Sequence, residues 1–185
     1  MNHPDVVLVD VDDNPIGTAP KATVHTAETP LHRAFSCHLF DSSGRVLFSR
    51  RALGKQTWPG VWTNAFCGHS AEGEDRVDAL VRHGGFELGL AIDRSAVEMA
   101  VPTFAYRAQD ASGIIEHEIC PVFTVRMDCS PVPNPDEVVD FAWLAPETLD
   151  GVVTGAPWLV SPWSALQWAE LRGLPAPGLP SIQRL

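Results

Sequence analysis

The chain has 185 residues, a formal net charge of −10, 45% hydrophobic residues and 19% charged residues. This length and composition fit one globular domain with a sizeable core and exclude a disordered chain. The negative charge argues against a general nucleic-acid surface and against binding to anionic membranes. An anionic substrate would therefore need a local basic cluster or a metal ion.

The cysteines and the N-terminal stretch indicate where the protein works. The four cysteines form no CxxC pair, and the chain is too long for a small disulfide scaffold. The acidic N-terminal stretch lacks the basic start and long apolar core of a signal peptide. No apolar run approaches the roughly 18 residues that suggest a membrane span. We therefore expect a soluble, cytoplasmic protein with reduced thiols.

The first quarter of the chain has the pattern of short strands. The β-branched run at 5–10 predicts a strand, closed by a turn at 13–17. The apolar runs at 33–41 and 45–51 predict a hairpin, with the small residues 42–44 as its loop. These strands indicate a sheet near the N-terminus.

A helix is predicted over residues 72–90. Its apolar residues recur at helical spacing and its first turn is acidic, which suits the positive end of a helix dipole. Gly84 and Gly85 have low helix propensity, so the last turn is the weakest part of the prediction.

More strands follow the helix. The runs at 101–110 and 113–127 are expected to form a strand pair joined through residues 110–113. A further strand is expected at 138–146, and 146–152 is expected to be a short helix or turn. Many strands with few helices predict an α+β single domain with a mixed sheet.

The last predicted helix has clear start and stop signals. Ser161 is in an N-cap position, Pro162 follows at the first helical position, and Gly173 ends the pattern. The segment 173–185 is rich in proline and glycine and is expected to be a flexible tail. The predicted domain is therefore 1–172.

Glu116 and Glu118 are the first candidate functional residues. On a strand, alternation places both on one face and His117 on the other. One interpretation is an ordinary solvated sheet face. The alternative is a buried carboxylate pair, which in an apolar strand needs a metal ion or a shared proton.

Histidines supply the other candidate ligands. His25, His32 and His69 with the two glutamates would make a nitrogen–oxygen site that suits Mn, Zn or Fe better than Mg or Ca. The sequence alone does not show that these residues meet, and His38 and His83 lie in the same regions.

A basic cluster lies close to the Cys67–His69 segment. It comprises Arg50, Arg51 and Lys55, with Lys21 and Arg82 elsewhere in the chain. Arginine presents a fork that matches phosphate oxygens and lysine a point charge. Phosphate binding and a solvated strand end are equally good interpretations of these residues alone.

The predicted helix resembles the Nudix pattern in spacing. The matching positions are Gly68, Glu74, Arg82, Glu87, Gly89 and Leu90. His83 and Phe86 stand where that pattern has glutamates, and Gly84 replaces an apolar residue. In Nudix hydrolases the glutamates hold Mg²⁺, so this chain is expected to hydrolyse diphosphates poorly. It retains Glu87, and one carboxylate with substrate oxygens is enough to bind Mg²⁺.

Five stretches together resemble the type I isopentenyl-diphosphate isomerase family, which has a modified Nudix fold. They are "HTAETPLHRAFS", "RRALGKQTWPGVWTNAFCGH", "RHGGFELG", "YRAQDASGIIEHEICPVF" and "PWLVSPW". The signature TN-x-x-CGH and the E-x-E strand are specific to that family. The resemblance implies a Nudix-like mixed β-sheet flanked by helices and an enzyme that interconverts isopentenyl and dimethylallyl diphosphate.

The resemblance also implies binding residues. One divalent ion, Mn²⁺ or Zn²⁺, would be held by His25, His32, His69, Glu116 and Glu118. Mg²⁺ on Glu87 would bridge to the diphosphate of a small isoprenoid substrate, which would also contact Lys21, Arg51 and Lys55. Members often have a second basic residue where this chain has His83, which weakens the expectation that residue 83 binds substrate.

The implied catalytic residues are Cys67 and Glu118, on opposite faces of the isopentenyl chain. Tyr106 would support Glu118, and Trp163 would face the cationic carbon. A Nudix diphosphohydrolase is a rival hypothesis, but it would need the missing glutamates and has no use for Cys67. A non-catalytic diphosphate-binding module would explain the altered helix but not the combination of Cys67, Glu118 and three histidines. Nothing in the sequence indicates an oligomeric state.

Overall fold

The computed structural model describes residues 5–185, and its strands form two mixed sheets. The first four residues of the acidic N-terminal stretch lie outside the described residues. The six-stranded sheet has the order β13-β9-β10-β3-β1-β2. Its strands are β13 (Ile182–Arg184), β9 (Ala105–Gln109), β10 (Ile115–Ile119), β3 (His32–Arg33), β1 (Asp5–Val9) and β2 (Pro15–Pro20).

The second, seven-stranded sheet has the central order β12-β5-β4-β11-β8, with β6 paired to β5 and β7 paired to β4. Its strands are β12 (Val138–Leu144), β5 (Val46–Arg51), β4 (Phe35–Phe40), β11 (Val122–Arg126), β8 (Val97–Val101), β6 (Trp62–Thr63) and β7 (Phe66–Gly68). The α+β class with mixed sheets and few helices is therefore confirmed, with two sheets in place of one.

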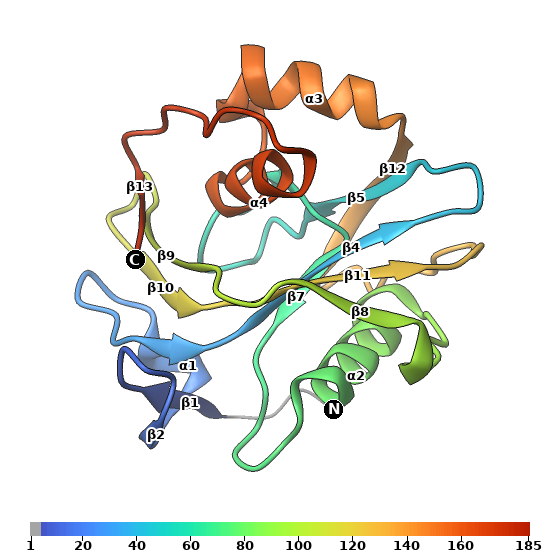
Figure 1. Cartoon of the computed structure of the whole chain (residues 1–185). Coiled ribbons are helices and arrows are strands. Elements are labelled where there is room, and N and C mark those ends of the chain that lie inside the picture. Colours follow the sequence, from blue (N-terminus) through green and yellow to red (C-terminus); the bar gives the residue numbers. More distant parts are fainter. Residues whose placement is uncertain (1–4) are drawn as a thin grey trace.

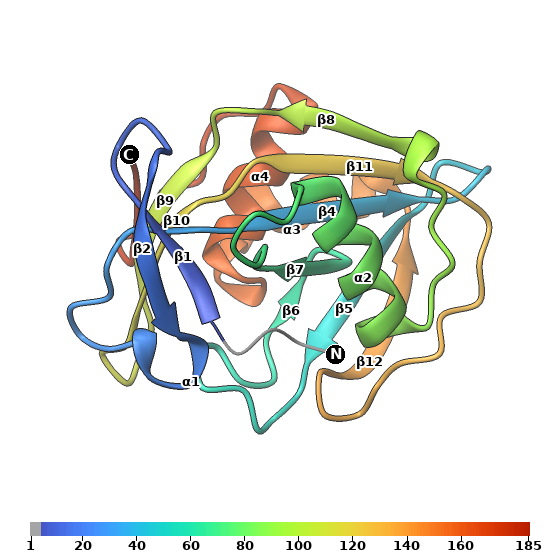
Figure 2. The ribbon, with the colours of Figure 1, turned by 90° about the horizontal axis from the view of Figure 1, so that it is seen from below.

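Two neighbouring segments of chain run side by side from one sheet into the other. Strand β10 is parallel to β3, with Glu118 opposite His32, and β11 is parallel to β4, with Val122 opposite Ser36. At the joint, the Ala34 amide donates to the Ile119 carbonyl at 2.9 Å. Figures 1 and 2 show these segments crossing the middle of the molecule. This seam holds His32 and Glu118 next to each other.

The seam corrects the prediction of one strand over 113–127. The run is two strands in different sheets, interrupted at Cys120 and Pro121, because proline cannot donate to a ladder. Likewise the predicted strand 101–110 is divided between the end of β8 and β9. The predicted hairpin connection through 110–113 is confirmed, since β9 and β10 pair antiparallel.

Helices cover the second sheet on both sides (Figure 1). Helix α2 (Arg76–Leu88) lies on one side, and α3 (Pro146–Gly155) and α4 (Pro162–Arg172) lie on the other. A short helix α1 (Lys21–Val24) follows β2, and 3-10 turns occupy Arg94–Ala96 and Pro157–Leu159. The core beneath α2 includes Phe35, Leu47 and Leu80, each fully buried.

Helix α2 confirms a helix within the predicted range 72–90, including its last turn, but it begins at Arg76, so the acidic residues expected in its first turn precede it. Asp75 caps its start by accepting from the Val77 amide, and Gly89 ends it in the left-handed region at φ 65°. Gly84 is favoured by packing, because a Cβ there would lie 2.6 Å from the Ile92 side chain. Close approach of the helix to the core thus outweighs the low helix propensity of glycine.

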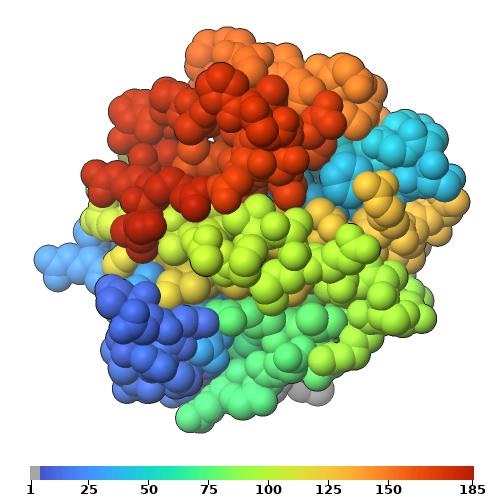
Figure 3. Space-filling view, viewed as in Figure 1, coloured from blue at the N-terminus to red at the C-terminus, as the bar shows by residue number. Residues whose placement is uncertain are grey.

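Helix α4 also has the predicted ends. The Ser161 hydroxyl accepts from the Ser164 amide, Pro162 is the first helical residue, and Gly173 caps the end at φ 64°. Beyond it the segment 173–185, expected to be a flexible tail, contains β13, which pairs antiparallel with β9. Figure 3 shows this red segment lying against the rest of the protein. The boundary at residue 172 and the flexibility of the tail stay predictions.

Within the part of the chain that the structure describes, no helix has the length and apolar composition that a membrane span requires.

Candidate active site

A cavity of about 170 Å³ lies where the two sheets meet α1 and α2. The sequence-predicted site residues that line it are Lys21, His25, Arg51, Lys55, Cys67, His69, Glu87, Tyr106, Glu116, Glu118 and Trp163. His32 is the remaining one, and it lies fully buried against Glu118. Predicted site residues from five strands, three helices and the loops between them therefore meet at one place.

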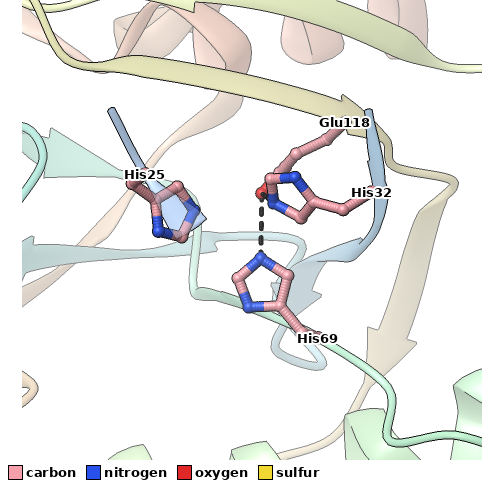
Figure 4. A group of neighbouring side chains, drawn as sticks. All are labelled: His25, His32, His69 and Glu118. Carbon is pink, nitrogen blue, oxygen red and sulfur yellow. Dashed lines mark hydrogen bonds and ion pairs between the residues drawn. The ribbon is translucent and has the colours of Figure 1, made fainter. Parts of the chain in front are cut away.

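Three histidines and Glu118 form a polar cluster at the cavity, with His32 buried behind Glu118 (Figure 4). One candidate ligand atom from each of the four residues lies within 4.8 Å of the others. The Nε2 atoms of His32 and His69 are 3.5 Å and 3.2 Å from the same oxygen, Oε1 of Glu118. Burial lowers the pKa of His69 to about 3 despite its contact with Glu118, so this ring is neutral at neutral pH.

The donor atoms of this cluster fit a bound divalent cation. The Nδ1 of His32 is 2.9 Å from the Pro30 carbonyl, so Nδ1 carries a proton and Nε2 is the ring atom left to bind a cation beside Glu118. Among the described residues, the buried Nε2 atoms of His25 and His32 and the Oε2 atom of Glu116 have no hydrogen-bond partner. Converging buried acceptors are costly unless a cation joins them. Neutral imidazole with carboxylate suits Mn²⁺ or Zn²⁺.

Glu116 extends the cluster along the same strand face. Its Oε2 lies 3.0 Å from Nε2 of His25, while its Oε1 accepts a 2.6 Å hydrogen bond from the Thr57 hydroxyl. Glu116 and Glu118 are 7% and 6% exposed, and His117 is half-buried on the opposite face. The interpretation of a solvated face is therefore wrong, since both carboxylates are buried.

Contacts with two histidines decide the ionisation of Glu118. Desolvation alone would raise the pKa of this carboxyl, but its contacts with His32 and His69 hold the pKa well below its usual range. Glu118 is thus an anion inside the cavity. It faces Tyr106 directly across the β9–β10 pair.

The Cys67 thiol lies in a polar niche at the cavity wall. Its Sγ is 3.1 Å from the Ser36 hydroxyl, and 3.3 Å from Oδ1 and 3.2 Å from Nδ2 of Asn64. Burial raises the pKa of Cys67 to about 12, against the opposing effect of these hydrogen bonds. The thiol therefore carries its proton at neutral pH, which suits a proton carrier better than a resting nucleophile.

Aromatic rings form the apolar part of the wall. Tyr106 and Trp163 are stacked with centroids 5.9 Å apart and an interplanar angle of 28°. Trp58 packs edge-on against Trp163 at 5.1 Å and has the rare backbone φ of 42° for a bulky residue. The Trp163 indole donates to Asn64 Oδ1 at 3.3 Å. Trp163 thus has a fixed orientation, and the Arg51 guanidinium lies over its ring, 5.5 Å from the centroid, as a cation–π partner.

Three cations enter the cavity from separate elements. Lys21 begins α1, Arg51 ends β5, and Lys55 lies in the following loop, where it is paired with Glu137. Burial lowers the pKa of Lys21, and it lowers the pKa of Lys55 to about 8 although Glu87 opposes the shift. The Arg51 guanidinium donates to the Thr57 carbonyl at 2.9 Å, which holds the loop in place.

On α2, only Glu87 of the predicted binding residues faces this cavity. Its Oε1 accepts from Nδ1 of His83 at 2.9 Å. His83 is buried behind it, 1% exposed, and a Cβ on Gly68 would lie 2.6 Å from its Nε2. His83 therefore orients Glu87 and does not line the cavity. A single carboxylate at this position fits a Mg²⁺ ion that takes most of its ligands from outside the protein.

Sequence reasoning missed several residues of the site. Gln56, Thr57 and Gly68 line the cavity, and Ser36 and Asn64 contact the Cys67 sulfur. Asn64 stands in the TN-x-x-CGH signature, so its place beside Cys67 was the one available signal. Ser36 approaches through the β4–β7 pairing, where it is directly opposite Cys67. That pairing is long-range and has no local sequence pattern.

Comparisons with known proteins define the class first. The NUDIX domain family model matches residues 30–164. A solved structure from Deinococcus radiodurans has TM-score 0.61 and 21% identity, covering 82% of this chain and 90% of that one. A MutT protein from Methanosarcina mazei Go1 has TM-score 0.62 and 13% identity, covering 78% and 94%. The chain is a Nudix-domain protein.

Closer relatives then give the family. An isopentenyl-diphosphate Delta-isomerase from Agromyces mediolanus is 58% identical over 84% of this chain and 75% of that protein. One from Leifsonia xyli subsp. xyli (strain CTCB07) is 54% identical over 85% of each chain. The chain belongs to the isopentenyl-diphosphate Delta-isomerase family and is an isomerase, which supports that prediction over the Nudix-hydrolase and binding-module alternatives.

Proposed function

We propose that the protein interconverts isopentenyl and dimethylallyl diphosphate by adding a proton at C4 of the alkene and removing one from C2. The observation that carries this is the meeting of Cys67, Glu118 and Trp163 in one cavity with three cations. The thiol and the carboxylate would act as the two acid–base groups on opposite faces of the alkene. One proton enters and one leaves, so the step is balanced without a redox partner.

The cavity walls would protect the intermediate of this reaction. Protonation of the alkene develops positive charge at C3, which water would trap. The buried rings of Trp163 and Tyr106 exclude water, and the Trp163 π face stabilises a cation. The ionised Glu118 adds further stabilisation of positive charge nearby.

Metal ions and basic side chains would bind the substrate diphosphate and orient the carboxylates. His25, His32, His69, Glu116 and Glu118 would hold Mn²⁺ or Zn²⁺, and Glu87 would hold Mg²⁺ together with the substrate diphosphate. Such ions supply positive charge that orients carboxylates and neutralises phosphate oxygens. Lys21, Arg51 and Lys55 would bind the diphosphate directly. The four free thiols, all within the described residues, support a reducing, cytoplasmic setting.

The test is proton NMR of isopentenyl diphosphate in D₂O with the Mg²⁺- and Mn²⁺-loaded protein. Dimethylallyl diphosphate with deuterium in the new methyl group is the expected product. Cys67→Ala should abolish the conversion while inorganic diphosphate still binds, because the thiol is a proton carrier. Wild-type turnover by this variant would exclude the mechanism, and release of phosphate by the wild type would indicate a hydrolase.

A further inference from the structure

A chain of buried polar side chains leads from Cys67 away from the cavity. Ser36 Oγ is 3.1 Å from Cys67 Sγ, and Gln167 Nε2 donates to Ser36 Oγ at 2.9 Å. His38 Nε2 lies 3.2 Å from Gln167 Oε1. Ser36, His38 and Gln167 are each 0% exposed. Polar groups in a dry interior are costly unless they are hydrogen-bonded, so this chain needs an explanation.

In this series of hydrogen-bonded side chains, each residue donates to the next one toward Cys67. Burial lowers the pKa of His38 to about 4, so at neutral pH its ring has a single N–H. Nε2 faces the amide oxygen of Gln167, an acceptor, and therefore carries that proton. The amide nitrogen of Gln167 then faces Ser36, whose oxygen accepts. The Ser36 hydroxyl proton is left for a partner beyond.

Two sulfurs lie within reach of that proton. Cys67 Sγ is at 3.1 Å and Cys120 Sγ at 3.3 Å. Cys67 lines the cavity, whereas Cys120 is 1% exposed and packs in the core. The shorter contact and the polar surroundings both favour Cys67.

Asn64 does not replace Ser36 as the donor to this sulfur. Its amide nitrogen is 3.2 Å from Cys67 Sγ, but it donates to the Cys37 carbonyl at 3.0 Å and to the Phe66 carbonyl at 2.9 Å. Those two bonds use both protons of the amide. Asn64 therefore fixes the loop, and Ser36 supplies the hydroxyl.

We propose that Ser36, oriented by Gln167 and His38, is a positioning residue that directs its O–H to the Cys67 sulfur. Ser36 then does not accept the thiol proton, which faces Asn64 Oδ1 at 3.3 Å. This inference rests on the proposed function, because it assigns a partner to the proton carrier. A donor already aimed at the sulfur also needs no reorientation when the thiol gives up its proton. Ser36 itself touches no reacting atom.

The test compares steady-state kinetics of Ser36→Ala and Gln167→Met in the metal-loaded full chain. Loss of one preorganised donor can cost 10²–10³ in kcat, and for a positioning donor we expect a loss of about 10- to 100-fold. The KM for isopentenyl diphosphate and the Ki of inorganic diphosphate should stay within about twofold, since neither contact reaches the diphosphate. Gln167→Met should lose about threefold to tenfold, because Ser36 remains but is no longer held.

A double variant tests whether Ser36 and Gln167 act in one hydrogen-bonded series or contribute independently to the structure of the cavity wall. If both residues act through Cys67, the double variant should lose no more kcat than Ser36→Ala alone, as coupled residues are not additive. Additive losses, or a rise of KM in step with the fall in kcat, would mean that both residues only support the wall. Either result would overturn the proposal.

Matched controls exist in the same region. Ser164 is on α4 with Gln167, is 0% exposed, and its hydroxyl has no hydrogen-bond partner within residues 5–185. Ser164→Ala and Cys120→Ala should keep wild-type kcat. A loss in Cys120→Ala equal to that in Ser36→Ala would assign the hydroxyl to Cys120 and refute the proposal.

The outcomes distinguish failure of the proposed function from failure of the positioning role of Ser36. If the wild type does not isomerise the substrate, the proposed function itself fails. If the wild type is active and Ser36→Ala keeps its kcat within twofold, only the positioning role fails. Should Ser36→Ala not fold, as judged by its thermal unfolding, Gln167→Met decides by the same split between kcat and KM.

Discussion

The histidine–carboxylate cluster and helix α2 face the same cavity, but their charged groups are partnered in different ways. In the cluster, buried nitrogen and oxygen acceptors point at one another, and within the described chain the Nε2 atoms of His25 and His32 have no hydrogen-bond partner. On α2, Arg82 donates to both oxygens of Glu74 at 2.8 Å and 2.7 Å, and His83 donates to Glu87.

This difference indicates that the cation site with several protein ligands lies at the histidine–carboxylate cluster and not along the helix with the Nudix spacing. The helix keeps the spacing of the Nudix pattern, yet its Arg82 is paired with Glu74 before the helix and its His83 with Glu87. The cluster has an unbalanced excess of acceptors, which is the mark of a site completed by a cation. Spacing alone would have directed attention to the helix, whereas unsatisfied atoms direct it to the seam between the sheets.

The largest test of this comparison removes a cluster ligand. His69→Gln should empty the Mn²⁺ or Zn²⁺ site and lower kcat by more than about 100-fold, since even outer-shell partners cost 10- to 100-fold. Elemental analysis and NMR turnover measure the two effects. The matched control is His117→Gln, on the outer face of β10, which should keep both metal and activity. Full metal content in His69→Gln would contradict the cluster assignment.

The next test addresses the one α2 residue in the cavity. Glu87→Gln should raise the Mg²⁺ concentration needed for half-maximal activity by about tenfold, because a carboxylate is the preferred Mg²⁺ ligand. The metal content of the histidine cluster should not change. Titration of activity with Mg²⁺ and elemental analysis of the same sample check this. A loss of the cluster metal would show that the two sides are not separate sites.

A third test uses the depressed pKa of Lys55. Burial lowers this pKa to about 8, so the charge is present below pH 8 and is lost as pH rises through it. We expect kcat/KM to fall about fivefold between about pH 7 and 9.5, because free-enzyme ionisations govern that parameter. Lys55→Arg keeps its charge and should flatten the profile. The same fall in both enzymes would assign it to another group.

The smallest effect is expected at the Glu74–Arg82 pair. Glu74→Gln should lower the free energy of unfolding by about 1 kcal/mol, as the pair is partly exposed and hydrogen-bonded. Activity should stay within about twofold. Urea denaturation and steady-state kinetics measure these changes. A large loss of activity with normal stability would show that Glu74 takes part in substrate or metal binding, which would contradict the comparison.

Much of the fold was predictable because its signals are local. The ends of α4 follow from Ser161, Pro162 and Gly173, and α2 follows from its apolar spacing. The division of 113–127 between two sheets was not predicted, because the apolar pattern continues across Cys120 and only Pro121 interrupts it. Short strands such as β6 and β7 also have too few residues to show a period.

The set of site residues was predicted from the family resemblance, because periodicity alone does not show which side chains meet in space. Alternation on β10 did predict the common face of Glu116 and Glu118. Ser36, which is opposite Cys67, and Gln167, which donates to Ser36, were not predicted, since strand pairing and helix packing bring them from distant parts of the chain. Such contacts depend on tertiary structure alone.

The seam between the sheets has a consequence for folding. His32 meets Glu118 only when β3 and β10 pair in parallel, although most of the chain between them belongs to other strands and helices. Pairings between such distant segments form slowly and late, because a long loop must close first. The cluster should therefore be absent from early folding intermediates. Metal uptake during refolding would then report completion of the fold, and a bound ion would raise the melting temperature by binding only the native state.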